Sequence, residues 1–256
     1  DACSGGNIDD SNRFAITKFA HIHFPATKKS AERIIKLGEE RWRVHQVGSP
    51  ALDAILTESI PNATELTNRL KLDLSKKPIL VIQHPVTIQM EEATEQMHIT
   101  LEAVTEFGHP VVVIYPNSDA GGRKMIEVIE EFKSSYAITT FHNLPRRDYL
   151  GLLNIAGVLV GNSSSGIIDA PSFGLPVVNI GIRQEGRERG GNILDVEHDK
   201  LAIIKAIDQA LSDIDFISRI KKRRSPYGDG KASQRIIKVL KNTRITTELL
   251  QKRITY

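Results

Sequence analysis

The feature of this sequence that most constrains its fold is an alternation, from residue 79 onward, of short apolar runs with longer amphipathic segments. Parallel strands need crossover connections, so repeated strand-then-helix units predict an α/β fold with a doubly wound parallel sheet. The runs are continuously apolar, which is typical of strands buried on two sides. The runs are ILVIQ (79–83), VVVIY (111–115), AITTF (137–141), VLVG (158–161) and PVVNIG (176–181), and the helical segments are 88–107, 121–133, 146–156 and 164–173.

Residues 9–56 repeat this pattern on a smaller scale, and we interpret them as the last units of a first α/β domain over residues 1–60. The expected elements are helices over 9–20 and 28–37 and strands over IHFPAT (22–27) and RVHQV (43–47). The polar stretch 61–78, with two prolines, is the predicted linker. A second domain is predicted over 79–230, with a helix at 200–212, and the final segment 231–256 is expected to pack its helix back toward the first domain.

Charge and composition argue against several classes of protein. The 256-residue chain has 34 basic and 31 acidic residues, and its basic run at 219–224 has no interleaved aromatic residues, so nucleic-acid binding is not expected. Cys3 is the only cysteine, and no apolar run approaches the roughly 18 residues of a membrane span. We expect a soluble, cytoplasmic protein without membrane contact. The opening DACSGGNIDD is not typical of a natural start, so the sequence is expected to begin inside a longer protein.

Polar residues follow four of the predicted strands at the point where each strand ends. In an open parallel sheet the carboxyl ends of the strands face one crevice, where loops and helix starts converge on a ligand. His84 follows the first strand, Asn117 the second, the serines 163–165 the fourth and Arg183 the fifth. The sequence therefore predicts a ligand site at this edge of the sheet.

The segment GNSSSGIIDAPSFG (161–174) says most about the ligand. Small hydroxyl residues open a predicted helix directly after a buried strand, and the free N–H groups of a helix start suit a phosphate or pyrophosphate. Asp169 can accept hydrogen bonds from a ribose diol. The alternative is that Ser163 or Ser164 only caps the helix. Because Arg183 and His84 are expected at the same edge, the phosphate interpretation is favoured.

Other polar residues carry two interpretations each. His84, which precedes a proline, is a candidate donor to a phosphate or a leaving oxygen, and a packed histidine is the alternative. Asn117 and Asp119 either form a Pro-Asn-Ser-Asp turn or contact the ligand. His21 and His23 lie on one face of a predicted strand without Cys or Glu at ligand spacing, so no metal site is predicted.

Seven segments, in this order and spacing, resemble the hydrolysing UDP-N-acetylglucosamine 2-epimerases. The resemblance implies two Rossmann-like domains in the glycosyltransferase-B arrangement, with the first domain incomplete in this chain. It covers nearly all of the sequence. The segments are IDDSNRFAITKFAHIHF, VGSPALDAI, QHPVT, YPNSDAG, GNSSSGIIDAPSFG, NIGIRQEGRERGGNIL and YGDG.

The resemblance also assigns residues to the two halves of a nucleotide sugar. Two departures from the family stand out: Asp169 replaces a usual Glu, and the stretch from Gly5 to Asp10 is several residues shorter than a loop that usually carries a Glu. If that shortening is genuine, a catalytic acid or base is missing, and if it reflects an omitted loop, nothing is lost. By resemblance UDP is held by His84, Asn117, Ser163, Ser164, Asp169 and Arg183, catalysis uses Asp9, Asp10 and His84, and Arg13 faces the sugar across the cleft.

The chemistry implied by the resemblance needs no cofactor and no metal. UDP leaves C1 as the C2 proton is removed by Asp9 or Asp10, and water then adds with inverted configuration at C2. His84, Arg183 and the helix at Ser163 would stabilise the developing phosphate charge. Family members tend to form homodimers or homotetramers, and this sequence does not decide between them.

Four functions remain open at this point: a hydrolysing epimerase, a non-hydrolysing epimerase, a glycosyltransferase of the same architecture, and a nucleotide-sugar-binding module without catalysis. Non-hydrolysing relatives usually carry His-Arg-x-Glu-Asn after the first strand and Gly-Gly-x-Gln-Glu-Glu at the helix start. Here those places read QHPVT (83–87) and SSSGIID (163–169). The hydrolysing type is therefore the favoured prediction.

Overall fold

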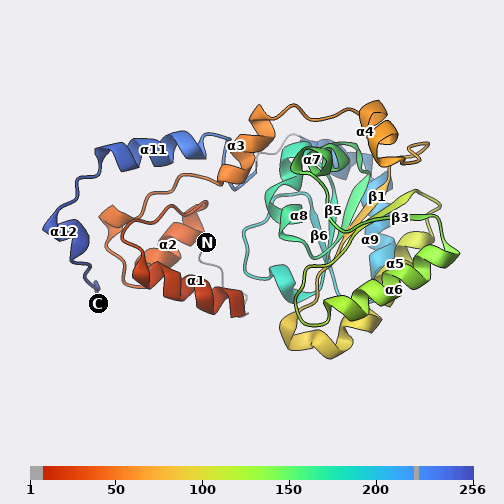
Figure 1. The fold of residues 1–256 in the computed structure, drawn as a ribbon, viewed down its shortest axis with the longest axis horizontal. Coiled ribbons are helices and arrows are strands. Elements are labelled where there is room, and N and C mark those ends of the chain that lie inside the picture. The colour runs from red at the N-terminus through yellow and green to blue at the C-terminus, as the bar shows by residue number, and fades with distance from the viewer. Residues whose placement is uncertain (1–7, 222–224) are drawn as a thin grey trace. The chain divides into compact units, whose positions relative to one another are not determined.

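The structure, a computed structural model, describes residues 8–221 and 225–256 (Figure 1). Cys3, the short loop before Ile8 and the end of the basic run 219–224 lie outside the described residues. The chain divides into two compact units. The first unit comprises residues 1–57, 185–188 and 224–256, and the second comprises 58–184 and 189–223.

The second unit is built on a six-stranded, all-parallel sheet with the strand order β3-β2-β1-β4-β5-β6. The predicted α/β class is confirmed, and the five predicted strands are all present. The sequence did not predict β6, because Asp195 interrupts its short apolar run and this edge strand is only partly buried. The strands are β1 (Ile79–Ile82), β2 (Val111–Ile114), β3 (Ile138–Phe141), β4 (Val158–Gly161), β5 (Val177–Ile180) and β6 (Ile193–Val196).

Helices of the second unit cover the sheet on both faces (Figure 1). Strand residues that alternate along each strand pack into one buried cluster with α5 (Ala93–Thr105), α6 (Gly122–Ser135) and α9 (Lys200–Ser212). The other helices are α4 (Ala63–Leu70), α7 (Arg146–Ile155), α8 (Ser164–Ile168) and α10 (Ile214–Lys221), with 3-10 turns η2 (Thr87–Glu92), η3 (Ala170–Phe173) and η4 (Ile182–Gln184).

Two helix predictions in the second unit need correction. The helix expected over 88–107 starts as the 3-10 segment η2, and Gln89 has non-helical backbone angles there. The helix expected over 164–173 is split into α8 and η3. Pro171 accounts for the break, because a proline lacks the N–H that would continue the ladder of α8. Within the predicted linker, α4 carries a capping box between Asn62 and Glu65 and packs against α7.

The first unit contains helices but almost no sheet. Its elements are α1 (Ile8–Phe19), α2 (Lys28–Lys36), η1 (Arg41–Arg43), α3 (Pro50–Thr57), α11 (Ala232–Asn242), which contacts α3, and α12 (Thr247–Leu250). The two strands predicted at 22–27 and 43–47 were wrong, since these segments share one parallel bridge, between His23 and Val44. Pro25 has no N–H to donate, so it interrupts the ladder that would extend this bridge.

Buried charges stabilise the first unit. Glu39 is 1% exposed and accepts hydrogen bonds from Lys18 at 3.2 Å, His23 at 3.0 Å and Lys252 at 2.7 Å. Burial alone would raise the pKa of Glu39, but these hydrogen bonds outweigh it and lower the pKa. Arg43, also fully buried, donates to the carbonyl groups of residues 21, 248 and 249. The C-terminal segment is therefore tied to the body of this unit by charge-assisted bonds.

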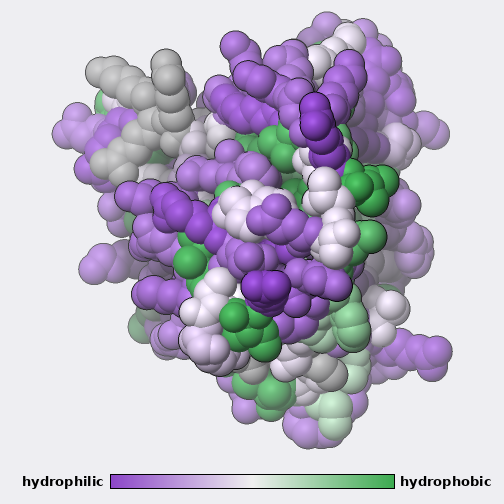
Figure 2. All heavy atoms as spheres, turned by 90° about the vertical axis from the view of Figure 1, so that its left-hand side faces the viewer, coloured by the Kyte–Doolittle hydropathy of each residue, from purple (hydrophilic) through white to green (hydrophobic). Residues whose placement is uncertain are grey.

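Large apolar side chains remain exposed in the first unit. Figure 2 shows exposed hydrophobic residues, in green, among the hydrophilic residues of one face of the molecule. Phe19, Ile245 and Tyr256 are each more than 80% exposed. Along the described ranges 8–221 and 225–256, no helix has both the length and the apolar character that a membrane span requires.

Candidate functional site

The candidate site lies at the carboxyl ends of β1 and β4, where the order of the sheet reverses. From β1 the chain proceeds outward through β2 and β3, and from β4 it proceeds the other way through β5 and β6. Such a switch point leaves a crevice that is the usual ligand site of doubly wound sheets. Gly161, the last residue of β4, has φ of +127°, and a Cβ there would clash with the carbonyl oxygen of Ile82. Glycine therefore permits the close approach of the two strand ends.

Asn162 cross-links the segments that meet at this switch point. Its Oδ1 accepts from the backbone N–H of His84 at 2.7 Å, and its Nδ2 donates to the carbonyl oxygen of His84 at 2.8 Å. Its own carbonyl oxygen accepts from Arg183 Nη1 at 3.1 Å and Gln184 Nε2 at 2.8 Å. Asn162 is 0% exposed. One fully buried amide thus fixes the positions of His84 and Arg183 relative to each other.

The ring of His84 has a defined hydrogen-bonding state. The backbone N–H of Asn117 donates to Nδ1 of His84 at 3.1 Å, so the proton of the neutral ring is on Nε2. Burial, and then the charge of Arg183, lowers the pKa of His84 to about 4, and Asp119 opposes the shift. His84 is therefore a neutral donor at ordinary pH, with Nε2–H available to an acceptor.

The side chain of Asn117 is occupied within its own turn. Its Nδ2 donates to Asp119 Oδ2 at 2.6 Å, and the Asp119 carbonyl accepts from the N–H of Gly122 at 2.9 Å. The turn interpretation of these two residues therefore describes the side-chain contacts. The contribution of Asn117 to the site in this structure is its backbone N–H to His84.

The segment after β4 carries a chain of side-chain hydrogen bonds. Ser163 Oγ accepts from the backbone N–H of Ser165 at 3.3 Å. Ser163 therefore caps α8, which was the alternative to phosphate binding in the sequence analysis. Ser165 Oγ donates to Asp169 Oδ2 at 2.8 Å and accepts from the hydroxyl of Tyr149 on α7. Burial raises the pKa of Asp169, and the Ser165 hydrogen bond and the charge of Arg146 oppose this only in part. Burial also raises the pKa of Tyr149, so its hydroxyl keeps its proton.

A cavity of about 370 Å³ opens beside this chain of hydrogen bonds. Its apolar wall comes from Ile82, Ile114 and Leu144, and its polar wall includes Tyr149, Ser163 and Ser165. The apolar residues are the last residues of β1 and β2 and a residue of the loop before α7. A slot with one apolar and one hydroxyl-bearing wall suits a flat heterocyclic ring.

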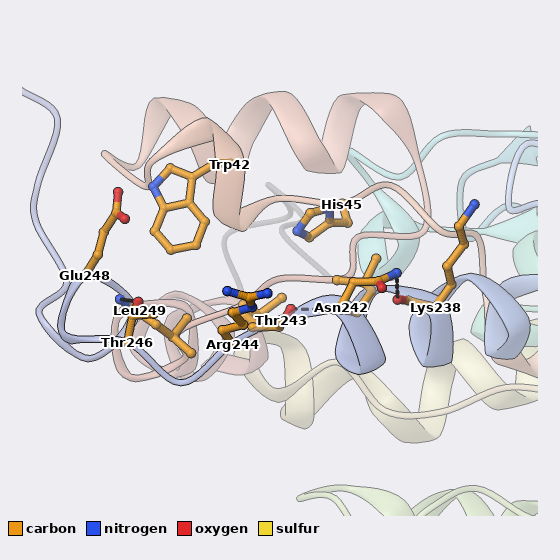
Figure 3. A pocket seen from close by; sticks show the side chains of 11 residues that line it. Trp42, His45, Lys238, Asn242, Thr243, Arg244, Thr246, Glu248 and Leu249 are labelled. Atoms are coloured by element: carbon orange, nitrogen blue, oxygen red, sulfur yellow. Dashed lines mark hydrogen bonds between the residues drawn. The ribbon is translucent and has the colours of Figure 1, made fainter.

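A second groove, of about 530 Å³, lies within the first unit (Figure 3). Figure 3 shows the rings of Trp42 and His45 on one side and the side chains of Asn242 and Arg244 on the other. None of the residues that the sequence predicted for the site line this groove. Among the described residues there is also no cluster of three or more His, Cys, Asp or Glu that could hold a metal ion.

Residues 3–241 match the family model described as UDP-N-acetylglucosamine 2-epimerase. The chain belongs to this epimerase family. A hydrolysing UDP-N,N'-diacetylbacillosamine 2-epimerase of Legionella pneumophila is 36% identical over 96% of this chain and 64% of its own length. A UDP-N-acetylglucosamine 2-epimerase of Neisseria meningitidis is 32% identical over 81% of this chain and 54% of its own length. The chain therefore spans less than two thirds of the length of these relatives.

Solved structures of the epimerase family share the fold. The crystal structure of a UDP-GlcNAc 2-epimerase from Neisseria meningitidis, bound to UDP-GlcNAc, matches with a TM-score of 0.79 over 92% of this chain and 65% of that one. Its sequence is only 17% identical to this chain, so the match concerns the fold alone. The resemblance read from the sequence is thus confirmed at the level of family and fold.

The structure brings together most of the second-unit residues predicted from the family resemblance. His84, Asn117 and Arg183 are linked directly or through Asn162, and Ser163 and Asp169 are linked through Ser165. Ser164 is the first residue of α8. The roles of these residues toward a ligand stay predictions.

The remaining predicted residues lie on α1, which belongs to the first unit. Asp9 lies in α1, and its side chain is outside the described structure. Asp10 is 2% exposed, and its Oδ1 accepts from Arg13 Nη1 at 3.0 Å.

Sequence reasoning did not assign a role to Asn162 or Tyr149, and it placed Ser165 at the ligand edge only as one of three consecutive serines. Asn162 had a usable signal, because it is a polar residue directly after a buried strand. Tyr149 had none, since it sits within an amphipathic helix 16 residues before its partner Ser165. Only the folded chain shows that α7 presents this hydroxyl to α8.

Proposed function

We propose that this protein is a hydrolysing 2-epimerase that acts on a UDP-linked acetamido sugar and releases UDP. The observation that carries the proposal is the Asn162 cross-link, which holds a neutral imidazole donor and a guanidinium at the switch point of the sheet. The family match and the hydrolysing relative at 36% identity support the same conclusion.

The diphosphate is the part of the substrate that the second unit is best equipped to bind. Arg183 is half-buried and offers a guanidinium, whose bonds to phosphate oxygens are charge-assisted. His84 offers Nε2–H without carrying a charge of its own. Both donors come from rigidly fixed loops, so they can meet charge that develops on the leaving phosphate without reorganising. Ser163 and Ser164 stand at the neighbouring strand end.

The cavity over β1 and β2 is our proposed place for the base of the nucleotide. Its apolar residues would cover the faces of the ring, and its hydroxyl-bearing wall leads to Asp169. We assign the ribose diol to Asp169, since its Oδ1 is buried and accepts no hydrogen bond from any residue that the structure describes. A buried carboxylate oxygen without a donor is costly, and a sugar hydroxyl would supply one.

The proposed reaction is an elimination followed by addition of water. A base removes the proton from C2, the C1–O bond breaks with its electron pair on the UDP oxygen, and a glycal double bond forms between C1 and C2. Water then delivers its hydroxyl to C1 while a proton is added at C2 from the opposite face. We assign the C2 base to Asp9 or Asp10 by family resemblance, and Asp10 pairs with Arg13 at 3.0 Å.

We propose further that the enzyme releases free UDP and does not return an epimerised UDP-sugar. Non-hydrolysing relatives usually carry an Arg and paired Glu residues in the strings that correspond here to QHPVT (83–87) and SSSGIID (163–169). The Legionella pneumophila relative, which is named as hydrolysing and is 36% identical, favours the same type. The scheme uses no cofactor and no metal, and a homodimer or homotetramer remains our expectation from the family.

There are two candidates for the sugar of the substrate, because the two relatives described above are named for different UDP-sugars. One is named for UDP-N,N'-diacetylbacillosamine and the other for UDP-N-acetylglucosamine. The test is to incubate the protein with each UDP-sugar separately and to follow the products by proton NMR. We expect free UDP and a 2-epimerised free sugar from one of them. Accumulation of a 2-epimerised UDP-sugar without free UDP would overturn the hydrolysing assignment.

A further inference from the structure

Tyr149, Ser165 and Asp169 form a continuous chain of hydrogen bonds that starts in α7 and ends at a carboxylate. The Tyr149 hydroxyl donates to Ser165 Oγ, which in turn donates to Asp169 Oδ2 at 2.8 Å. A hydroxyl has one proton, and because Tyr149 donates to a lone pair of Ser165 Oγ, the proton of Ser165 points away from Tyr149 and toward Asp169. The tyrosine therefore sets the direction of the serine proton.

This direction decides how the carboxylate of Asp169 is presented. A free carboxylate rotates about its last torsion with little resistance, and a hydrogen bond at Oδ2 removes that freedom. The other oxygen, Oδ1, is then held in one place, buried and without a donor among the described residues. Two of the three residues in the chain, Tyr149 and Ser165, also line the 370 Å³ cavity.

We propose that Tyr149 is a positioning residue for nucleoside recognition: through Ser165 it fixes Asp169 so that Oδ1 selects a ribonucleotide over a 2′-deoxyribonucleotide. The inference rests on the proposed function, because it takes the nucleoside diphosphate as the ligand of this site. It adds a residue and a selectivity that neither the motifs nor the fold assign.

The geometry explains why the hydroxyl, rather than the ring, carries this role. The Tyr149 ring lines the cavity whether or not it bears an oxygen, so a phenylalanine there keeps the wall and loses only the hydrogen bond. Without it Ser165 loses the donor that keeps its proton directed at Asp169, and Asp169 is free to turn Oδ1 away from the diol. Affinity for the diphosphate, held by Arg183 and His84, is unaffected by this change.

The experiment is calorimetric titration of the full chain with UDP and with 2′-deoxy-UDP. The variants are Tyr149→Phe, Ser165→Ala and the two combined. Tyr115→Phe is the matched control, since Tyr115 is another tyrosine of the same unit and its hydroxyl donates to Glu130 instead. Ser165→Ala interrupts the same chain without touching the aromatic core, so it carries the test if Tyr149→Phe does not fold.

We expect the wild-type chain to prefer UDP by about tenfold or more, the usual effect of one hydrogen bond to a charged group. Tyr149→Phe and Ser165→Ala should each reduce this ratio to about threefold or less by weakening UDP alone, and the double variant should lose nothing further. Tyr115→Phe should keep the full ratio.

Two results would overturn the inference alone: a Tyr149→Phe variant with the wild-type ratio, or one that weakens both nucleotides equally. A wild-type chain that binds neither nucleotide would overturn the proposed function, and the inference with it. The two failures are therefore distinguishable in one set of titrations.

Discussion

The two units of the molecule are stabilised in different ways. The second unit has a continuous apolar core on a six-stranded sheet, and its site residues come directly after the strands. Among its described residues, the first unit has a single β-bridge, and it relies on the buried charges around Glu39 and Arg43. Of the sixteen large apolar side chains exposed among the described residues, ten belong to the smaller first unit.

The two units therefore differ in how accurately they can position a side chain. A parallel sheet fixes the ends of its strands to within the tolerance of its hydrogen-bond ladders, so a polar residue after each strand is placed accurately. Charge clusters hold segments together but depend on every member being present. We therefore expect the first unit to be the more easily unfolded, and the second to keep its affinity for UDP when the first is perturbed.

The largest effect is expected from Glu39→Ala. Removing this carboxylate takes the side-chain partner from the buried ring of His23 and the counter-charge from Lys252, which should lower the free energy of unfolding of the first unit by about 4 kcal/mol. Trp42, the only tryptophan and a first-unit residue, reports this by fluorescence in a urea titration. Glu32→Ala is the control, because Glu32 is exposed and its pair with Lys28 is long, at 3.9 Å.

The same variant tests whether the units are independent. UDP affinity of Glu39→Ala, measured by calorimetry below the urea midpoint, should equal that of the wild type. A loss of affinity in step with the loss of Trp42 signal would show that the first unit supports the second.

The next effect concerns the response to acid. The pKa of His84 is about 4 in the folded chain, against an ordinary value of 6.5. The unfolded chain therefore takes up a proton between pH 6.5 and 4 while the folded chain does not. Stability present above pH 6.5 should fall by about 3 kcal/mol over this window. His84→Gln should remove most of that fall, and His109→Gln should not. Identical pH profiles for His84→Gln and the wild type would refute the burial of a neutral imidazole.

Arg183→Ala should weaken UDP by about 2 kcal/mol, or roughly thirtyfold, because a half-buried guanidinium donates charge-assisted bonds to phosphate. The measurement is calorimetry at constant salt. Arg219→Ala, which removes an exposed arginine on α10, should change the affinity little. Equal affinities in the Arg183 and Arg219 variants would remove Arg183 from the site.

The smallest effect is expected at the start of α11. Asp53 on α3 accepts from the backbone N–H groups of Ala232 at 2.9 Å and Ser233 at 2.6 Å. Burial would raise the pKa of Asp53, but these bonds prevail and lower it. Asp53→Ala should lower the stability of the first unit by about 1 kcal/mol, as loss of a helix cap does. Trp42 fluorescence in urea measures it, and a change in UDP affinity would be unexpected.

The same contrast between the units governs what could be predicted from the sequence. The five strands from β1 to β5 were predictable because short runs rich in apolar and β-branched residues alternate there with helix-length segments, even though β3 contains two threonines and β5 contains Asn179. β6 was missed because Asp195 breaks its pattern, and the first-unit strands were wrong because Pro25 stops a ladder that the apolar run IHF alone suggests. His84 and Arg183 could be expected at one edge from topology.

Contacts that depend on packing between elements could not be predicted from the sequence. The tie between Tyr149 and Ser165 requires knowing how α7 lies against α8, and the Asn162 cross-link requires knowing that β1 and β4 are neighbours. A sequence gives neither before the sheet order is known. The buried network of Glu39 was hidden for the same reason, since Lys18 and Lys252 are separated by most of the chain.

The most direct test of the central claim is calorimetric titration of UDP into three forms of the chain. The claim is that residues at the switch point of the second unit hold the UDP moiety, and that the carboxylates of the first unit serve the sugar. We predict that Asp10→Asn binds UDP within about threefold of the wild type, and that His84→Gln combined with Arg183→Ala weakens it by about a hundredfold or more. Retained affinity in the double variant, or loss of UDP binding in Asp10→Asn, would contradict the claim.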